Sequence, residues 1–314
     1  MNLLVTGGAG FIGSEFVSQV ASDTSINITV LDSLTYAGDL RNLEACRDKI
    51  DFVEIDIRNK PALEALFKEK QFTQIVHFAA ESHVDNSIAN PTIFAETNVL
   101  GTLNLLELSR KHSLERFLHI STDEVYGSVK EGFSSETSPL NPSSPYSASK
   151  AAAEHFVLSF LHTFSLPVLM VRCSNNYGPR QFPEKLIPHF ISKLLRNEPV
   201  PVYGDGKNVR EWLHVSDCAR GIASVLQDGK IGEIYNISSG IFRENLEVTR
   251  MLVEIMGKGP NLINFVEDRK GHDFRYAIDS SKIRTELGWE PKVQLEEGLR
   301  ETVKWFTENK ERLG

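Results

Sequence analysis

Short apolar runs rich in β-branched residues alternate with longer amphipathic stretches through the first half of the chain. The runs predict six strands, at residues 3–5, 28–31, 52–55, 75–78, 116–120 and 168–171. The amphipathic stretches predict helices at residues 12–20, 61–69, 90–112 and 146–164. Strands that alternate with helices are typical of a parallel sheet with helices on both faces. We therefore expect an α/β fold built on a doubly wound parallel sheet.

The pattern changes after Arg172, where proline and glycine become frequent, as in residues 176–179, 197–199 and 204–206. This change predicts a smaller, more irregular second domain. A return to the sheet is expected around residues 232–237, and residues 295–311 are expected to form a final helix. The expected division is a larger domain of residues 1–171 with about 207–240, and a smaller domain of about 172–206 with 241–314.

Composition and charge narrow the class of protein. Hydrophobic residues make up 41% of the 314 residues and charged residues 24%, as in a folded globular chain. The 34 basic residues are outnumbered by 42 acidic ones, and the net charge of -8 argues against a nucleic-acid partner. This charge still allows one basic pocket for a single phosphorylated small molecule.

Cysteine usage and hydropathy bear on the compartment. Cys46, Cys173 and Cys218 have neither metal-site spacing nor a disulfide framework, so we expect a reducing, cytoplasmic location and no bound metal. No stretch approaches the roughly 18 apolar residues of a membrane span, so no membrane partner is expected. The first apolar run has no basic segment before it, which argues against a signal peptide.

A glycine-rich turn follows the first predicted strand and opens the first helix. Residues 6–13 read T-G-G-A-G-F-I-G, in which Gly8, Gly10 and Gly13 match G-x-G-x-x-G. Gly7, Gly10 and Gly13 also match a G-x-x-G-x-x-G spacing. Glycines here allow a tight turn and let a pyrophosphate approach the backbone at the helix N-terminus. The context predicts a dinucleotide site.

Two aspartates after later strands refine this prediction. Asp32 ends the second predicted strand, about twenty residues on, where a carboxylate holds ribose hydroxyls. No Arg or Lys follows Asp32 closely, so a 2′-phosphate would be repelled and NAD is favoured over NADP. Asp56, after the third strand, is either a contact for the adenine edge or a turn or helix-cap residue. Both interpretations remain open.

Tyr146 and Lys150 lie four positions apart on a predicted helix and so share one face. A cation near a phenol lowers the phenol pKa from about 10, which would make Tyr146 a base near neutral pH. Alone, this spacing is typical of two residues on a solvated helix. The preceding dinucleotide motif is what favours a catalytic pair.

Asp123 and Glu124 follow the fifth predicted strand, at the edge of the sheet where ligands bind in open α/β folds. One interpretation is a helix N-terminus with acidic residues near the dipole. The other is a general acid and a general base whose environments separate their pKa values.

At these residues the chain resembles the extended short-chain dehydrogenase/reductases, and among them the nucleotide-sugar 4,6-dehydratases. The resemblance runs nearly end to end, through TGGAGFIG (6–13), LDSLTYAG (31–38), FAAESHVD (78–85), STDEVYG (121–127), PYSASKA (145–151), RCSNNYGP (172–179), FPEKLIP (182–188), YGDGKNVREWLHV (203–215) and DRKGHDFRYAID (268–279). It implies a Rossmann-type doubly wound sheet with a smaller C-terminal α/β domain for the substrate. It also implies a lyase with tightly bound NAD that is regenerated each turnover. A homodimer is implied as well, and we expect the helices around 92–112 and 145–164 to form its interface.

The resemblance assigns a role to each residue of the catalytic group. Thr122 and Tyr146, with Lys150 beside them, would act at the hydroxyl on carbon 4 of the sugar while a hydride passes to NAD. Glu124 would then remove the proton on carbon 5, which the new ketone acidifies. Asp123 would protonate the departing hydroxyl on carbon 6, and the hydride would return to that carbon. The product would be a 4-keto-6-deoxy sugar nucleotide.

The binding residues implied by the resemblance form two sets. The cofactor set is Gly7, Gly10, Phe11, Ile12, Gly13, Asp32, Asp56, Ile57, Ala79, Ala80, Ser82, Thr97, Tyr146 and Lys150. The substrate set, for a nucleotide-diphosphate hexose, is Ser82, His83, Thr122, Asn175, Lys185, Leu186, Pro188, Tyr203, Arg210, Asn245, Arg269 and His272.

Two positions depart from the family pattern and leave the substrate open. Asn86 stands where the family usually has Arg, and Arg180 stands where an aromatic residue is usual. We expect dTDP-glucose as the substrate, converted to dTDP-4-keto-6-deoxyglucose, with UDP-N-acetylglucosamine or UDP-glucose as alternatives. A 4-epimerase would not need Asp123 and Glu124, and a dinucleotide sensor without turnover would not need the Tyr–Lys pair.

Overall fold

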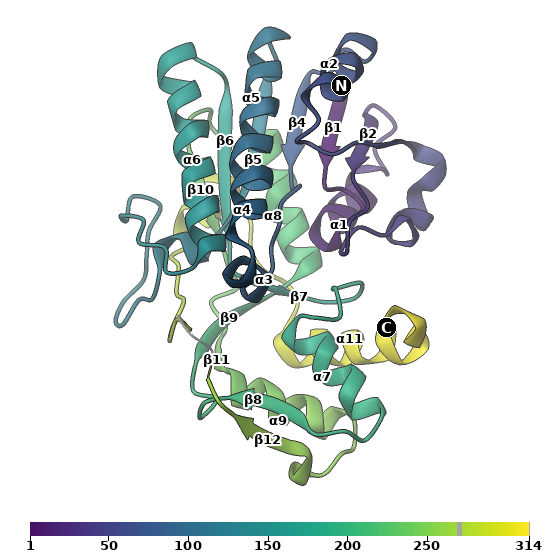
Figure 1. Cartoon of the computed structure of the whole chain (residues 1–314), viewed down its shortest axis with the longest axis vertical. Helices are drawn as coiled ribbons and strands as arrows, with labels where there is room; N and C mark the ends of the chain where they lie inside the picture. The colour runs from purple at the N-terminus through teal and green to yellow at the C-terminus, as the bar shows by residue number, and fades with distance from the viewer. Residues whose placement is uncertain (269–271, 314) are drawn as a thin grey trace.

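Seven parallel strands form the largest sheet, in the order β10-β6-β5-β4-β1-β2-β3 (Figure 1). The structure is a computed structural model that describes residues 1–268 and 272–313. The strands are β1 (Asn2–Thr6), β2 (Asn27–Asp32), β3 (Ile50–Glu54), β4 (Gln74–His77), β5 (Arg116–Thr122), β6 (Val168–Cys173) and β10 (Ile234–Ile237). The expected doubly wound sheet is confirmed, and the segment at residues 232–237 supplies its edge strand β10 beside β6. The strand order reverses between β1 and β4, which is where such sheets bind dinucleotides.

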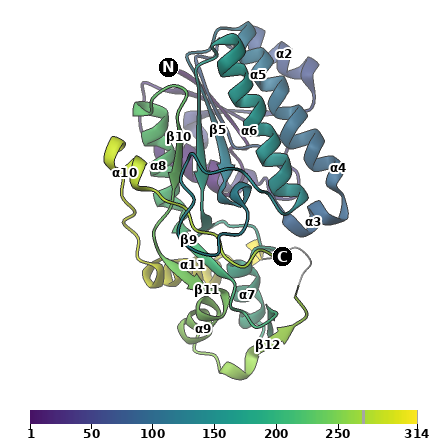
Figure 2. The ribbon, with the colours of Figure 1, turned by 90° about the vertical axis from the view of Figure 1, so that its left-hand side faces the viewer.

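Helices cover both faces of this sheet (Figure 2). One face carries α1 (Phe11–Val20), α8 (Val215–Asp228) and α10 (Ser281–Leu287), and the other α2 (Lys60–Glu69), α5 (Thr102–Lys111) and α6 (Pro145–Phe164). Because strand side chains alternate, Leu3 and Val5 enter the core beneath α1, whereas Leu4 enters the core on the opposite face. A strand buried on both faces is a continuous apolar run, which is the pattern the sequence shows.

The expected helix at residues 90–112 is not one regular α-helix. It begins as α4 (Pro91–Phe94), continues through the π-helical segment η2 (Ala95–Gly101) and ends as α5, and the unpredicted α3 (Val84–Ala89) precedes it. Gly101 packs so closely that an added Cβ would lie 2.6 Å from the Ile57 Cδ1 atom. Such π-helical turns are rare and occur mostly at functional sites.

A smaller part lies below the carboxyl ends of the large sheet (Figure 1). Its two small sheets pair β11 (Phe242–Glu244), β9 (Val209–His214) and β7 (Asn175–Tyr177), and β12 (Ile263–Val266) with β8 (Val200–Tyr203). Its helices are α7 (Leu186–Leu195), α9 (Asn245–Ile255) and α11 (Leu295–Glu308), which share a third core. Short 3-10 segments are η1 (Leu40–Lys49), η3 (Asp123–Tyr126), η4 (Pro260–Leu262) and η5 (Lys310–Arg312). Among the described residues, no helix is long and apolar enough to cross a membrane.

Candidate active site

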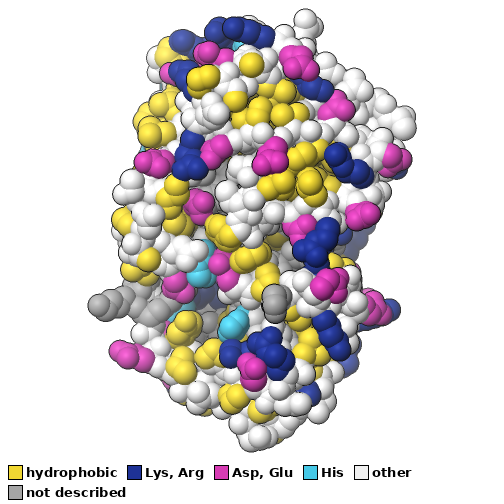
Figure 3. All heavy atoms as spheres, turned by 45° about the vertical axis from the view of Figure 1, so that its right-hand side comes forward, with side chains coloured by type: hydrophobic (Ala, Val, Ile, Leu, Met, Phe, Trp, Pro, Cys, Tyr) yellow, Lys and Arg dark blue, Asp and Glu magenta, His cyan; other side chains and the backbone are white. Residues whose placement is uncertain are grey.

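A cavity of about 320 Å³ lies at the carboxyl edge of the large sheet, around the point where the strand order reverses. Segments that follow β1 through β6 line it, together with the N-terminal half of α6 and the segment that precedes α7. The molecular surface is hollowed between the two parts, and histidine and acidic side chains border the opening (Figure 3). All fourteen residues of the expected cofactor set line this cavity.

The glycine loop leaves backbone alone facing the cavity. Gly7 has a φ of 69°, and a Cβ there would lie 2.5 Å from the Ala79 nitrogen. A Cβ at Gly13 would lie 2.3 Å from the Gly7 oxygen. Gly10 is the N-cap of α1 and has no side chain to bond the first-turn amides. These amides and the helix dipole favour an anionic group, so the loop fits the pyrophosphate of a dinucleotide.

Asp32, at the end of β2, is held toward this loop. Its carboxylate accepts hydrogen bonds from the Ala9 amide at 3.0 Å and the Leu34 amide at 2.9 Å. Burial raises its pKa, and these backbone bonds oppose that rise. Each carboxylate oxygen can accept a further hydrogen bond, so Asp32 can still accept from ribose hydroxyls, as the sequence predicts for NAD.

Asp56 lines the cavity and also makes a turn contact. Its carboxylate accepts from the Arg58 amide at 2.8 Å and from the Arg58 guanidinium at 2.5 Å. The guanidinium holds the pKa of Asp56 below its usual range. Arg58 also lines the cavity. Sequence reasoning missed it because it follows the third strand rather than the second.

Thr122, Asp123 and Glu124 join the end of β5 to the 3-10 turn η3. The Thr122 hydroxyl accepts from the Glu124 amide at 3.2 Å, so the helix-cap interpretation is correct. Asp123 is 2% exposed, and its Oδ2 atom has no hydrogen-bond partner among the described residues. Burial raises its pKa well above the usual range, and the charges of Glu124 and Glu211 raise it further. The separated-pKa interpretation is therefore compatible with the cap, because the surroundings of Asp123 favour the neutral, protonated form of its carboxyl group.

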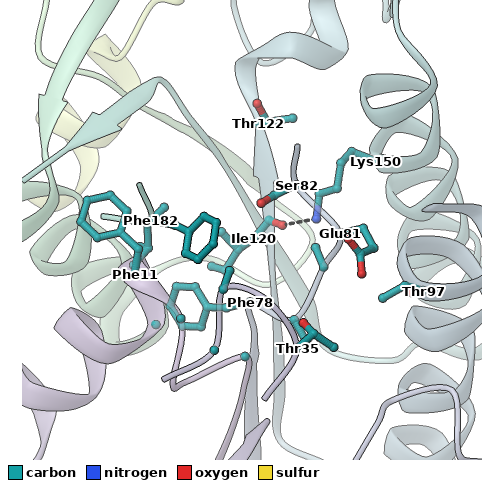
Figure 4. Close-up of a pocket in the computed structure, with 18 of the residues that line it drawn as sticks. Phe11, Thr35, Phe78, Glu81, Ser82, Thr97, Ile120, Thr122, Lys150 and Phe182 are labelled. Atoms are coloured by element: carbon teal, nitrogen blue, oxygen red, sulfur yellow. Dashed lines mark hydrogen bonds between the residues drawn. The ribbon is translucent and has the colours of Figure 1, made fainter. Parts of the chain in front are cut away.

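Tyr146 and Lys150 are both buried on one face of α6, which begins with a Ser144–Ser147 capping box. The Lys150 ammonium donates to the Ile120 carbonyl at 2.6 Å (Figure 4). Burial lowers the pKa of Lys150 to about 8.

The expectation that Lys150 lowers the Tyr146 pKa is wrong for this structure. Burial raises the pKa of Tyr146, and the nearby Glu124 raises it further, while a hydrogen bond with Thr122 opposes the rise. The spacing in sequence places the two side chains on one face. It does not show that the ammonium bonds a strand carbonyl instead of the phenol.

The π-helical turn fixes the loop after β4. The Asn98 side chain accepts from the Glu81 amide at 2.8 Å and donates to the Glu81 carbonyl at 3.0 Å. It also donates to the Ser149 hydroxyl of α6 at 2.8 Å. This network ties residues 79–82, which line the cavity, to the helix that carries Tyr146 and Lys150.

The expected substrate residues are not all in this cavity. Four of them line it, namely Ser82, Thr122, Asn175 and Lys185. His83 lies beside Glu184, with Nδ1 and Oε2 3.7 Å apart. Leu186 and Pro188 form the first turn of α7. Arg269 lies outside the described residues.

The remaining substrate residues gather on the smaller part. The rings of Tyr203 and His272 meet edge to face, with centroids 6.2 Å apart. Asn245 is the first residue of α9, and its buried Oδ1 atom has no hydrogen-bond partner among the described residues. Arg210 stacks its guanidinium over Tyr276 at 4.4 Å. Its positive charge opposes the rise in the Asp123 pKa, which links this group to the acidic pair.

Sequence reasoning missed several aromatic and acidic residues around the cavity. Phe182 and Glu184 line it, and the Tyr36 ring contacts that of Phe182 with centroids 5.4 Å apart. Glu211 is fully buried near Asp123. All four residues lie within the motifs that carry the resemblance: Tyr36 in LDSLTYAG, Phe182 and Glu184 in FPEKLIP, and Glu211 in YGDGKNVREWLHV. The motifs therefore indicated these segments, but not that these particular side chains lie at the cavity.

Comparison with known proteins agrees with this arrangement. The sequence model of the family described as GDP-mannose 4,6 dehydratase matches residues 4–302. The chain belongs to this family. The match covers nearly the whole chain, as the resemblance indicated.

Relatives in the family carry specific activities in their names. A dTDP-glucose 4,6-dehydratase of Actinoplanes sp. is 48% identical over 318 residues, covering 99% of both chains. The low-salt glycan biosynthesis protein Agl12 of Haloferax volcanii is 49% identical, covering 98% of both chains.

Solved structures show the same fold in two kinds of enzyme. DesIV, a dTDP-glucose 4,6-dehydratase from Streptomyces venezuelae with NAD and dTDP bound, superposes with a TM-score of 0.96, 48% identity, and coverage of 99% of this chain and 98% of that chain. A UDP-glucose 4-epimerase from Thermotoga maritima superposes with a TM-score of 0.92 and 34% identity, covering 98% and 99%. Because dehydratase and epimerase share the fold, the site residues must separate the two activities.

Proposed function

We propose that this chain converts dTDP-glucose to dTDP-4-keto-6-deoxyglucose, as an NAD-dependent 4,6-dehydratase. The observation that carries the proposal is the buried Asp123 beside Glu124, at the end of β5 and lining the same cavity as Tyr146. Loss of water needs an acid and a base in one site, and this pair supplies both. Relatives named dTDP-glucose 4,6-dehydratase over their full length support the choice of substrate.

The first step is oxidation at carbon 4, in which the hydroxyl on that carbon loses its proton. Bound NAD supplies the hydride acceptor and later the hydride donor. Tyr146 takes the hydroxyl proton, and Thr122 holds the same hydroxyl. Burial disfavours the Tyr146 phenolate, so proton transfer to this side chain needs positive charge near it. Lys150, one turn along α6, is proposed to supply that charge in the complex with substrate, whereas in this structure its ammonium donates to the Ile120 carbonyl.

The elimination follows because the ketone on carbon 4 acidifies the proton on carbon 5. Glu124 accepts that proton, and Asp123 donates its own to the hydroxyl that leaves carbon 6 as water. Carbon 6 then receives the hydride taken from carbon 4 and carbon 5 regains a proton, which gives the 4-keto-6-deoxy sugar. Burial and the neighbouring charges of Glu124 and Glu211 raise the pKa of Asp123, which favours the protonated form that proton donation to the leaving hydroxyl needs. Two adjacent carboxyl groups favour holding one proton between them, which matches one acid and one base.

We also assign the binding roles. The larger part would hold NAD through the cofactor set, with Asp32 on the ribose hydroxyls and Asp56 near the adenine. The smaller part would hold the nucleotide diphosphate. Arg210 suits a diphosphate because its planar fork makes paired, charge-assisted hydrogen bonds. The other residues proposed for this part are Asn175, Lys185, Leu186, Pro188, Tyr203, Asn245, Arg269 and His272.

We propose a cytoplasmic homodimer that uses the helical faces around 92–112 and 145–164. Leu100 on η2 is 54% exposed and Phe156 on α6 is 39% exposed, so both helices carry apolar side chains on the surface. Free, buried cysteines fit a reducing compartment. Sedimentation as a monomer at micromolar concentration would refute the dimer.

Mass spectrometry of the purified protein with dTDP-glucose, UDP-glucose and UDP-N-acetylglucosamine, each alone and with no added NAD, tests the function. We expect loss of one water from dTDP-glucose only. Loss of water from a UDP sugar alone would move the proposal to that substrate. An unchanged mass with inversion at carbon 4 would favour the epimerase, which the fold also accommodates. If none of the three sugar nucleotides is converted, even with NAD supplied, the proposed dehydratase activity is refuted.

A further inference from the structure

Residues 178–185, named here the strap, connect β7 to α7 and pass beneath α1 (Figure 1). Both ends of the strap belong to the smaller part, yet Gln181, Phe182, Glu184 and Lys185 line the cofactor cavity. Phe182 lies near Phe11 of the glycine loop and Phe78 at the end of β4 (Figure 4). The strap therefore forms one wall of a cavity whose opposite wall is the large sheet.

Besides the approach of His83 to Glu184 described above, three contacts tie the strap to the larger part. The Phe182 ring meets the Tyr36 ring after β2, with centroids 5.4 Å apart. The Lys185 ammonium donates to the Ser82 carbonyl after β4 at 3.0 Å. The Arg180 guanidinium forms an ion pair with the Glu15 carboxylate of α1.

The Arg180–Glu15 pair differs from the other two contacts in what it anchors. Glu15 lies in α1, the helix whose first turn carries Gly10 and Gly13. The pair therefore links the strap directly to the element that would bind the pyrophosphate. Its side chains are only 22% and 17% exposed, so water screens it less than a surface pair.

The backbone at Arg180 has an unfavourable conformation for a residue with a side chain. Arg180 has a φ of 69°, in the left-handed region that residues other than glycine, Asn and Asp seldom adopt. Its Nε atom is buried without a partner among the described residues. Such a conformation persists only where the surroundings impose it, and strained positions gather at ligand clamps.

We propose that Arg180 and Glu15 are positioning residues that hold the strap closed over the dinucleotide and so retain NAD between turnovers. The identity of the ligand rests on the proposed function. Neither side chain lines the cavity, so the pair acts through the strap and not by touching the cofactor. Opening the strap would free Phe182 and Lys185 from the larger part together, and the cofactor would then exchange with solvent.

Exchange of bound NAD against isotope-labelled NAD, followed by mass spectrometry, tests this proposal without any sugar nucleotide present. In Arg180→Met and in Glu15→Gln we expect exchange to be faster by about tenfold or more. The double variant should exchange no faster than either single variant, because the pair acts as one unit. Charge reversal, Glu15→Arg with Arg180→Glu, should restore slow exchange.

Lys282→Met is the matched control. Lys282 forms an ion pair with Glu233 at 2.6 Å, with side chains 21% and 48% exposed, between elements far from the strap. Unchanged exchange in Arg180→Met and Glu15→Gln would overturn the proposal, and so would equal acceleration in Lys282→Met. Rapid exchange in the unaltered protein would overturn it too. If Arg180→Met does not fold by circular dichroism, Arg180→Lys and Glu15→Gln decide the outcome, with intermediate exchange expected for Arg180→Lys.

The assay separates this proposal from the proposed function. One outcome is NAD exchange that depends on Arg180 and Glu15 in a protein that removes no water from dTDP-glucose at saturating NAD. That result would overturn the proposed function and support the proposed role of the strap. Water loss with exchange that ignores both residues would overturn the strap and leave the function.

Discussion

The two sides of the cleft reach their arrangement in different ways. On the cofactor side, every expected residue lines one cavity, because the segments after β1 to β6 all leave the same edge of one parallel sheet. On the side proposed to bind the nucleotide, named here the nucleotide side, Tyr203, Asn245 and His272 come from segments joined through two small sheets. On the cofactor side, the sheet topology therefore determines where a residue of given sequence position lies in the structure. The second side depends on long-range packing that spacing does not reveal.

The acidic pair lies where the two sides meet, and removing it should have the largest effect. In Asp123→Asn with Glu124→Gln, both proton transfers of the elimination are lost. We expect the rate of water loss to fall by about 10³-fold, within the range for general acid–base catalysis. Oxidation at carbon 4 does not need either carboxyl group, so NADH absorbance should accumulate after dTDP-glucose is mixed with the variant.

The single variants are the controls for this experiment. Asp123→Asn should slow departure of the hydroxyl, whereas Glu124→Gln should slow exchange of the carbon 5 proton with deuterium oxide. Continued water loss in the double variant would contradict the assignment of both residues.

Asp32→Ala should act on the cofactor side alone. The carboxylate accepts two backbone hydrogen bonds and is proposed to hold the ribose hydroxyls. Hydrogen bonds to a charged group contribute about 1.5–3 kcal/mol, so NAD affinity should fall by roughly 10- to 100-fold. Calorimetric titration of the cofactor-depleted protein with NAD measures this change. The KM for dTDP-glucose at saturating NAD should hardly change. A large rise in that KM would contradict the expectation that Asp32 acts on the cofactor side alone.

Asp56→Asn is the informative companion variant, because two interpretations of Asp56 remained open. Its bonds to Arg58 account for a turn role. A loss of NAD affinity in this variant would add the adenine contact, and an unchanged affinity would leave the turn role alone.

Arg210→Lys should act on the nucleotide side alone. Lysine keeps the charge but loses the planar fork and the stacking on Tyr276. We expect the KM for dTDP-glucose to rise by about tenfold while NAD exchange stays as slow as in the unaltered protein. Steady-state kinetics and the isotope exchange assay test the two halves of this statement. Faster NAD exchange would show that the two sides are coupled through β9.

The sequence was sufficient for the parallel sheet and for the acidic pair, for a shared reason. A run such as Ile28–Leu31 is apolar on both faces, so it must be a buried strand, and polar residues that follow it must lie at the sheet edge. Each predicted strand overlaps an observed one, and Asp32 and Asp123 stand where this rule places them.

The sequence was not sufficient where a contact between distant segments decides. The π-helical turn at Ala95–Gly101 lies against Ile57 and Glu81, and nothing in its local pattern separates it from an α-helix. The direction of the Tyr146 pKa was predicted wrongly because burial and the Ile120 carbonyl were not visible in the spacing. Helices α7 and α9 were missed because frequent Pro and Gly masked them.

Buried histidines give the smallest predicted effect, and they belong to the cofactor side. His77 on β4 contacts the Thr6 and Thr102 hydroxyls at 2.7 and 2.9 Å, and its ring lies 5.4 Å from that of His119. Burial and the Lys150 charge lower the pKa of His77 from 6.5 to about 3. The unfolded chain therefore binds a proton below pH 6.5 that the folded chain does not, and stability falls as the pH falls through that value.

Between about pH 7 and pH 6, one such histidine should cost about 0.7 kcal/mol of unfolding free energy. In His77→Gln, whose amide can still bond both threonines, the loss over this interval should be smaller by that amount. Urea denaturation at the two pH values measures it, with His155→Gln, exposed on α6, as the control. Equal losses in His77→Gln and in the unaltered protein would mean that His77 already takes up its proton in the folded sheet. The large sheet would then have no particular sensitivity to acid at β4.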